Sequence, residues 1–385
     1  MKNYKNASKH IAVLAFPFGT HATPLLNITR RLSEAAPSLV FSFLSTEQSN
    51  AVTFPNGEKV DKIQPFNVWD GLPEGFRFKG DPHEPVEYFL KAAPENFMKA
   101  MDVVVAETGK PIDCLLVDAF LWFSVDIAAD LNVPWMALWT AGPRALYVHV
   151  DTSFIRQHVG INDTLEKPLD FIEDFSSLSV ADLPDGIVNG KFEAPVQALL
   201  DKLEQVIPQA TAIAANSYEY LDNQVVNMLK SRFRNFLNVG ETHRKKLPEG
   251  FLERTSLKGK IVPWAPQQKV LQHEAVGVFV THGGWNSVLE SITGGVPMIF
   301  RPFFGDQGLN TKTVEAVWGF GLGLEGGMFT KEATVKALKV ILSSDEGKKM
   351  REKIAVQKEL AFKAVEPNGS SVENFKKLVE IMSSS

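Results

Sequence analysis

Short apolar runs separated by amphipathic stretches recur along the first 240 residues of the chain. Each run is long enough for a buried strand of a parallel sheet, and the stretches between the runs have the spacing of crossover helices. We therefore expect a doubly wound α/β half in this part of the chain. The expected strands are 11–16, 40–44, 112–117, 135–139 and 212–215, and the clearest expected helices are 24–35, with a proline suited to the first turn, and 86–107.

A second alternating series begins near Lys260 and predicts another α/β half. The region from 330 to 385 has helical periodicity throughout and should cap the assembly. Residues 240–248, between the two series, are polar, charged and without periodicity, which is typical of a junction. The expected strands of the second half are 260–262, 276–280 and 296–300, and its expected helices are 267–272, 285–293 and 307–317.

Composition and charge narrow the class of protein. The 385 residues exceed what one hydrophobic core usually serves, so two domains are expected. Hydrophobic residues at 44% and charged residues at 22% are average for a globular chain, and no run approaches the length of a membrane span. A net charge of -5 gives no diffuse attraction to nucleic acid or anionic lipid, so we expect neither as a partner and no membrane insertion.

The single cysteine, Cys114, cannot form an internal disulfide, which fits a reducing compartment and removes a thiolate metal cage. Three lysines before the apolar run 11–16 could imitate a secretory signal. That run is short and Pro17 interrupts it, so a buried strand explains it better. We therefore expect a cytoplasmic protein.

Familiar cofactor motifs do not explain this chain. Residues 321–326 match the dinucleotide fingerprint Gly-x-Gly-x-x-Gly by letters, but no helical periodicity follows, so a glycine-rich strand and turn is the better interpretation. Neither a phosphate-binding Gly-Lys-Ser/Thr loop nor a His-Glu-x-x-His pair nor an Asp-x-Asp motif occurs in the sequence. We expect no metal site and no cofactor.

The segment 264–307 carries a pattern suited to a nucleotide. An expected strand ends at Thr281-His282, two glycines follow, and Asn286 and Ser287 enter the first turn of an expected helix. Free backbone N–H groups and the positive dipole end at such a turn favour a diphosphate. Glu290 shares the helix face of those two residues and could accept hydrogen bonds from a ribose.

Two further residues of this segment suit a base: Trp264 offers a flat aromatic surface, and Gln267 offers a donor and an acceptor. Each residue of the segment also has a structural alternative. Trp264 could be a core residue, Asn286 or Ser287 a helix cap, and Glu290 part of a solvated face. Physical reasoning alone leaves both interpretations open.

A histidine and an aspartate follow expected strands of the first half. His21 comes after strand 11–16, and Asp118 ends strand 112–117. The carboxyl ends of parallel strands meet at one edge of a sheet, so these side chains can meet there. A carboxylate that holds an imidazole makes it a suitable general base. The alternative for His21 is a structural histidine in a loop.

Residues 264–307 resemble the donor-binding box of plant family 1 UDP-glycosyltransferases. By that resemblance the donor-binding residues are Trp264, Ala265 and Gln267 for uracil, His282, Trp285, Asn286 and Ser287 around the diphosphate, Glu290 for the ribose, and Asp306 and Gln307 for the sugar. A closing glutamine in this family favours glucose. Gly283 departs from the family pattern, which more often has cysteine there, but a backbone role survives.

The resemblance extends over nearly the whole chain. Residues 70–75, 118–123, 139–143 and 302–307 are similar to flavonoid or anthocyanidin 3-O-glucosyltransferases. It implies that His21 is the catalytic base for an acceptor hydroxyl and Asp118 its partner, and it implies no metal. The implied acceptor-binding residues are Phe18, Gly19, His83, Phe120, Thr140 and His149, of which His83 stands where such enzymes commonly carry glutamine.

The same resemblance implies a GT-B-like α/β fold with two Rossmann-like domains facing a cleft, the second one truncated. Gly240 passes almost directly into Leu247, so several dozen residues that open the donor domain are missing. We expect an acceptor-binding domain at 1–240, an incomplete UDP-sugar-binding domain at 241–365, and a helix at 366–385 that packs back on the first domain. Loss of a central strand and its turn should lower the stability of the second domain and its donor affinity.

The expected function is transfer of glucose from UDP-glucose, a co-substrate, to a hydroxyl of a flavonoid or anthocyanidin, the 3-hydroxyl being favoured. The reaction should be inverting and metal-independent, in a monomer whose partners are small molecules. One alternative is a catalytically impaired form that binds flavonoid or associates with full-length relatives. Another is the same chemistry with a different UDP-sugar or small phenolic acceptor.

Overall fold

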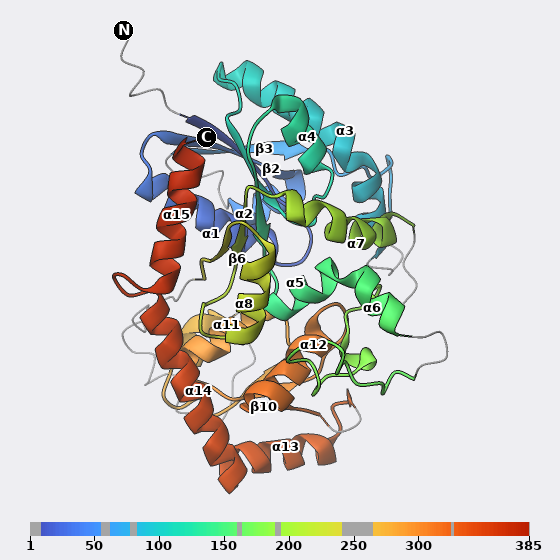
Figure 1. Ribbon diagram of the computed structural model, residues 1–385, viewed down its shortest axis with the longest axis vertical. Helices are drawn as coiled ribbons and strands as arrows, with labels where there is room; N and C mark the ends of the chain where they lie inside the picture. The colour runs from blue at the N-terminus through green and yellow to red at the C-terminus, as the bar shows by residue number, and fades with distance from the viewer. Residues whose placement is uncertain are drawn as a thin grey trace.

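The computed structural model of the chain describes residues 9–54, 62–77, 83–159, 164–188, 194–240, 265–324 and 327–384. These residues form two parallel sheets with helices packed around them (Figure 1). The first sheet lies in the upper part of that view and the second in the lower part. None of the described helices is both long and apolar enough to cross a membrane.

The first sheet has seven parallel strands in the order β3-β2-β1-β4-β5-β6-β7. The chain moves outward from β1 to one edge and then returns to build the other edge, so a topological switch point lies between β1 and β4. The strands are β1 (Lys9–Leu14), β2 (Leu39–Thr46), β3 (Ile63–Val68), β4 (Cys114–Asp118), β5 (Trp135–Trp139), β6 (Ala212–Ala215) and β7 (Phe236–Asn238).

Helices join these strands and cover both faces of the sheet. Thr46 caps α2 through its side chain, and Asn132 ends α4 in the left-handed conformation, as expected of these residue types. The helices are α1 (Ala22–Ala35), α2 (Glu47–Thr53), α3 (His83–Thr108), α4 (Ser124–Leu131), α5 (Pro143–Val150), α6 (Thr152–His158), α7 (Ala194–Val206) and α8 (Asn223–Arg232).

The predicted strands 135–139 and 212–215 match β5 and β6, whereas β1 and β4 each start two residues away from their predicted first residue. Helix α1 begins at Ala22, two residues before the predicted start, so Pro24 is its third residue and lies in the first turn, as predicted. Strands β3 and β7 were not predicted from the sequence. β3 carries Pro65 and an exposed residue at the sheet edge, and β7 has only three residues.

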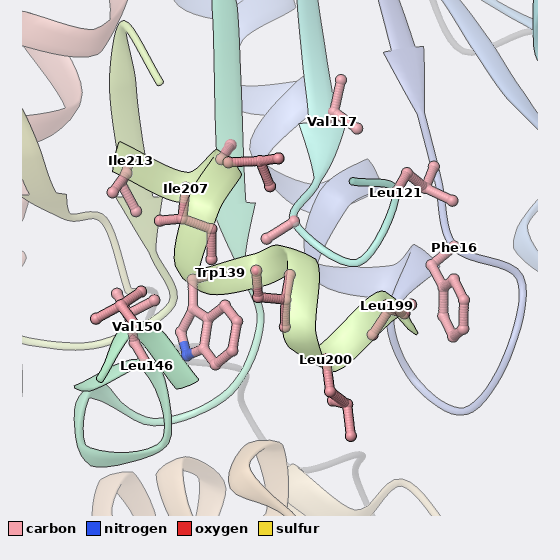
Figure 2. Packing of buried hydrophobic residues seen from close by; sticks show 14 of the residues in the cluster. Phe16, Val117, Leu121, Trp139, Leu146, Val150, Leu199, Leu200, Ile207 and Ile213 are labelled. Atoms are coloured by element: carbon pink, nitrogen blue, oxygen red, sulfur yellow. The ribbon is translucent and has the colours of Figure 1, made fainter. Parts of the chain in front are cut away.

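Alternate side chains of each strand supply two separate cores. Ala12 and Leu14 point to one face, where they join a large cluster under α3, α5 and α7, while Ile11 and Val13 join the cluster on the opposite face. Figure 2 shows part of the larger cluster, with Trp139 from β5 close to side chains of α5. Burial on both faces explains why these strands read as continuous apolar runs in the sequence.

The second sheet has three parallel strands among the described residues, in the order β10-β9-β8. Its strands are β8 (Phe279–Thr281), β9 (Met298–Phe300) and β10 (Gly321–Gly323). β8 begins three residues later than predicted, beyond Gly277, and β9 two residues later, directly after Pro297. Its helices are α10 (Gln267–Leu271), α11 (Trp285–Gly294) and α12 (Gln307–Lys312), which continues into a π-helical turn, Thr313–Trp318. The predicted strand 260–262 lies outside the described residues.

Residues 321–323 of the dinucleotide-like motif form strand β10 and no helix starts at residue 324, which agrees with the rejection of that motif; Glu325 and Gly326 lie outside the described residues. The carboxyl-terminal region is helical, as predicted, but divides into α13 (Lys331–Ser343), α14 (Asp345–Ala364) and α15 (Ser370–Ser384). The hydroxyls of Thr330 and Ser344 cap the first two helices, which explains the break between them.

Helices α14 and α15 connect the two halves. α14 packs on α11 of the second half, and α15 packs on β6 and β7 of the first sheet, as the red helices along the left side of Figure 1 show. Phe375 of α15 is buried and lies under the Arg31 guanidinium, 4.1 Å from ring centroid to Cζ. The end of the chain therefore returns to the first sheet. Most of the expected junction 240–248 lies outside the described residues.

Candidate functional site

His21 and Asp118 meet at the carboxyl edge of the first sheet. Asp118 is the last residue of β4, and His21 immediately precedes α1. The two side chains are joined by a hydrogen bond of 2.8 Å between Nδ1 and Oδ2. Because a carboxylate only accepts, Nδ1 carries the proton and donates it, which leaves Nε2 unprotonated in the neutral ring. The predicted proximity of these two residues is thus present in the structure.

The imidazole of His21 lies in an aromatic and charged environment. Its ring is 5.1 Å from that of Phe16 and 4.8 Å from that of Phe120, between centroids. Burial alone would lower the pKa of His21, but the Asp118 carboxylate, with a smaller contribution from Asp306, outweighs it and raises the pKa above the ordinary value of 6.5. His21 is therefore a stronger base than a free histidine.

The predicted acceptor-binding residues are partly brought together. Phe18 is half-buried and packs on Phe16, 5.3 Å between centroids, and Gly19 has a positive φ of 61° that suits glycine in this turn. Phe120 and His149 both contact Trp139. His83 is the first residue of α3, and its side chain lies outside the described set.

Two of these residues have specific polar surroundings. The Thr140 hydroxyl lies 3.1 Å from Nδ1 of His21, so this side chain contacts the base itself. His149 is buried, and burial lowers its pKa to about 4, so the ring is neutral near pH 7. Its Nδ1 has no hydrogen-bond partner among the described residues. A buried nitrogen without a partner is costly, which makes it a candidate to meet a ligand hydroxyl.

The turn that opens α11 has the predicted form. Gly283 has a φ of 87°, and a Cβ there would lie 3.1 to 3.2 Å from atoms of Thr311, Gln307 and Phe300, so glycine fits the site closely. Asn310 donates to the Gly283 carbonyl at 3.0 Å and steadies the turn. His282 is exposed beside it. The first N–H groups of α11 thus stand where a diphosphate could bind.

The side chain of Trp285 does not face this site. It is buried, its Nε1 donates to the carbonyl of Asn216 at 2.7 Å, and its ring packs against Gly142 of the first half. Any contribution of Trp285 to a bound donor must therefore come from its backbone.

Three predicted donor residues lie together between α10 and α11. The Gln267 amide donates to Ser287 Oγ at 3.1 Å and to Glu290 Oε2 at 2.6 Å, while Gln268 donates to Glu290 Oε1 at 3.2 Å. A carboxylate has about four acceptor positions, so Glu290 can hold these donors and still accept from a hydroxyl. Ala265 precedes this group, whereas Trp264 lies outside the described residues.

Asp306 and Gln307 lie at the start of α12. Burial raises the pKa of Asp306, against the opposing effects of the Asn310 amide, 2.9 Å away, and of His21. The Gln307 side-chain oxygen accepts from the backbone N–H of Phe303 at 2.9 Å. That oxygen therefore shapes the preceding loop, and the amide nitrogen is the part of Gln307 suited to donate to a ligand.

The two halves meet through Asn286 and two side chains that sequence reasoning missed, Thr20 and Asn216. Asn286 donates to Thr20 Oγ1 at 3.0 Å and accepts from Asn216 Nδ2 at 2.9 Å. Asn216 follows β6, at the same sheet edge as His21. The position rule that identified His21 could have identified Asn216 too, but asparagine in a loop carries no chemical signal of its own.

A cavity of about 1140 Å³ lies between α1 of the first half and α10, β8 and α11 of the second. Its lining includes Thr20, Asn216, Gln267, His282, Asn286, Ser287 and Glu290. Four of the residues predicted for the diphosphate and ribose, His282, Asn286, Ser287 and Glu290, thus face one space, on the side of α11 that meets the first sheet. This volume is ample for a nucleotide sugar.

Comparison with known proteins gives a consistent result. The family model for UDP-glucoronosyl and UDP-glucosyl transferase matches residues 241–356. The chain is 40% identical to a flavonol 3-O-glucosyltransferase of Arabidopsis thaliana, over 96% of both chains, and 42% identical to an anthocyanidin 3-O-galactosyltransferase of Actinidia chinensis var. chinensis, over 97% of both. The fold matches a crystal structure of UDP-glucose: anthocyanidin 3-O-glucosyltransferase in complex with UDP, with a TM-score of 0.90 and 34% identity over 99% of this chain and 100% of that one.

These comparisons confirm the predicted GT-B-like α/β fold with a shortened second half. The alignment with the Arabidopsis protein runs over 443 positions, against 385 residues in this chain, so dozens of aligned positions have no residue here. The second sheet, with three strands among the described residues against seven in the first, fits a loss from that half.

Proposed function

The chain belongs to the family of UDP-glucoronosyl and UDP-glucosyl transferases, and from that premise we propose that it transfers glucose from UDP-glucose to a hydroxyl of a flavonoid or anthocyanidin. We further propose that the 3-hydroxyl is the acceptor and that the reaction inverts the anomeric carbon without a metal ion. The observation that carries the proposal is the 2.8 Å pair of His21 and Asp118. His21 directly follows Thr20, the residue whose hydroxyl accepts from Asn286 in the first turn of α11.

His21 acts as the base in this mechanism. Its Nε2 takes the proton of the acceptor hydroxyl while that oxygen forms a bond to the anomeric carbon of the glucose. The bond from that carbon to the UDP oxygen breaks on the opposite face, so the configuration inverts. Asp118 holds the ring in the required tautomer and stabilises the imidazolium that forms. The Thr140 hydroxyl lies 3.1 Å from Nδ1, the nitrogen that Asp118 also contacts, and helps to fix the orientation of the ring.

The departing UDP gains negative charge, and α11 supplies the compensating field. Backbone N–H groups of its first turn, the helix dipole and the amide of Asn286 stand at the cavity. Such donors can serve the role that a metal ion serves in other transferases, which is the basis for proposing metal independence.

The remaining roles follow the resemblance. Gln267 and Glu290 are proposed for the uridine, His282, Asn286 and Ser287 for the diphosphate, and Asp306 and Gln307 for the sugar. Phe18, Phe120 and His149 are proposed to line the acceptor side, where aromatic surface suits a planar polyphenol. We also propose domains at 1–240 and 241–365 with a returning segment at 366–385, in a cytoplasmic monomer.

The test is a direct assay of the purified chain with UDP-glucose and an anthocyanidin or flavonol, with glycoside detected by mass. We expect product with the wild type, in the presence of EDTA as well, and none above background with His21→Ala. UDP binding of that variant by calorimetry should equal the wild type. Turnover retained by His21→Ala would refute the proposed base, and loss of activity in EDTA would refute metal independence.

A second candidate function is a catalytically impaired form that binds flavonoid or associates with full-length relatives. It is favoured by the difference between 443 aligned positions and 385 residues, because dozens of aligned positions have no residue in this chain. The same assay separates the two functions, because flavonoid binding without any glycoside favours the second.

A third candidate keeps the chemistry and changes the donor sugar. A relative that is 42% identical carries galactosyltransferase in its name, so overall similarity does not specify glucose. Competition between UDP-glucose and UDP-galactose in one reaction decides the preference. We expect glucose, because Gln307 closes the donor segment.

A further inference from the structure

Asn216 occupies a rigid position at the carboxyl edge of the first sheet. It directly follows β6, and its backbone N–H donates to the carbonyl of Trp139, the last residue of β5, at 3.0 Å. Thr140, which contacts His21, follows that same strand. Asn216 and the proposed base are therefore held by neighbouring strands of one sheet.

From this position Asn216 contacts both first residues of α11. Its carbonyl accepts the Trp285 indole N–H at 2.7 Å, and its side-chain amide donates to Asn286 Oδ1 at 2.9 Å. The indole also packs against Gly142, where even a Cβ would lie 2.9 Å from the ring. The start of α11 is thus fastened to the first sheet by two hydrogen bonds and a close contact.

The hydrogen bond from the Asn216 side-chain amide determines how the Asn286 side chain is oriented. With Oδ1 of Asn286 accepting from Asn216, its Nδ2 is turned to the Thr20 hydroxyl, 3.0 Å away. All three side chains line the same cavity. An amide held this way presents N–H groups, and not its oxygen, toward an anion in that cavity.

The geometry points to Asn216 as a positioning residue for the diphosphate of the nucleotide sugar: by fixing the amide of Asn286 and the start of α11, it holds the donor at a set distance from His21. This inference rests on the proposed function, because it assumes that Asn286 binds the diphosphate. Asn216 itself acts through Asn286 and need not contact the ligand.

A double-mutant cycle tests this role in the full chain. Asn216→Ala should weaken UDP binding, measured by calorimetry, by about three- to tenfold, the loss expected when one oriented hydrogen bond is removed. In an Asn286→Ala background the same substitution should change UDP affinity by less than about twofold, since the residue through which it acts is gone. The matched control is Asn223→Ala, which replaces an exposed asparagine at the start of α8. This variant should bind UDP as the wild type does.

Asn216→Asp gives a sharper test. A carboxylate cannot donate to Asn286 Oδ1, so the Asn286 amide must turn its N–H groups to the new carboxylate and its oxygen toward the anion. UDP affinity should fall further than in Asn216→Ala, while the KM for the flavonoid stays within about twofold of the wild type. A thermal melt of each variant checks that the chain is folded.

The outcomes separate this inference from the proposed function. If the wild type binds no UDP, both are overturned. If the wild type binds UDP but the two alanine substitutions add in full, or if Asn216→Asp binds UDP better than Asn216→Ala, only the positioning role is overturned. Non-additive losses confined to the donor support it.

Discussion

The chemistry of single residues in this protein depends on their neighbours more than on their type. His21 and His149 are both partly or fully enclosed, yet Asp118 raises the pKa of the first while burial lowers that of the second to about 4. His21 is therefore a stronger base than a free histidine, and His149 stays neutral near pH 7. The difference follows mainly from the Asp118 carboxylate, 2.8 Å from His21, with a smaller contribution from Asp306.

The pKa of His21 predicts the pH dependence of transfer. The base must be neutral to accept a proton, so kcat/KM should fall tenfold per pH unit below its raised pKa. Asp118→Asn removes the charge that raises this pKa, and burial then lowers it, so the acid limb should move to lower pH. The maximal rate should drop by on the order of a hundredfold or more, because the tautomer is no longer held. Rate profiles of both proteins, with UDP affinity as the control, check this; an unmoved acid limb would contradict it.

His149→Leu tests the proposed acceptor side. The substitution removes a buried nitrogen that lacks a described partner and keeps a similar volume, so stability to urea should be unchanged or rise by about 1 kcal/mol. The KM for flavonoid should increase severalfold while UDP affinity stays the same. A wild-type KM for the acceptor would show that this ring does not meet it.

Among the elements, buried charge joins α5 to α8. Arg144 of α5 is buried and donates to Asp222 Oδ2, beside the start of α8, at 2.7 Å and to the carbonyl of Asp174 at 2.7 Å. Helix α5 also carries His149. The Arg144–Asp222 ion pair therefore anchors a helix of the proposed acceptor side. Both of its side chains are buried, unlike those of the exposed ion pairs on the surface.

Arg144→Ala should destabilise the protein by about 3 to 5 kcal/mol, because it leaves the Asp222 carboxylate buried without its partner. Arg144→Met with Asp222→Leu, which removes both charges, should recover most of that loss. Lys99→Ala, which breaks an exposed pair with Glu95, is the control and should leave the stability close to that of the wild type. Urea unfolding of the wild type and the three variants measures these differences in the free energy of unfolding. If Arg144→Ala and the double substitution lost equal stability, the loss would not come from a buried, unpaired Asp222 carboxylate.

At the scale of the whole molecule, the site belongs to neither half alone. The cavity is lined from α1 on one side and from α10, β8 and α11 on the other, and the Thr20, Asn216 and Asn286 side chains cross between them. Helices α14 and α15 add a second connection away from the cavity. We therefore expect ligand binding to be coupled to the association of the halves.

UDP should for this reason stabilise the entire chain. At about a hundredfold over its Kd, a ligand that binds only the folded state adds about 2.7 kcal/mol, which corresponds to a rise in Tm of several degrees. A thermal melt with and without UDP, with inorganic phosphate as the control, measures this. Two separate transitions, only one of them shifted by UDP, would show that the halves unfold independently.

Much of the fold could be predicted from the sequence because it depends on local patterns. Strands buried on both faces leave apolar runs, so β5 and β6 were found to the residue, and the glycine turn before Trp285 has the predicted form. Strands β3 and β7 escaped because an edge position and a length of three residues leave no clear pattern. The placement of His21 beside Asp118 followed from a general rule for parallel sheets.

The sequence by itself determined the class of fold, the family and the residue types available for the chemistry, since these depend on periodicity and on motifs that are contiguous in the chain. Only the tertiary structure decided how those residues are oriented. It places the Trp285 ring against Gly142, the Thr140 hydroxyl beside Nδ1 of His21, and the Asn216 amide in a hydrogen bond with Asn286. The physical reason is that hydrogen bonds between residues far apart in the chain depend on how strands and helices pack, and no local pattern records that geometry.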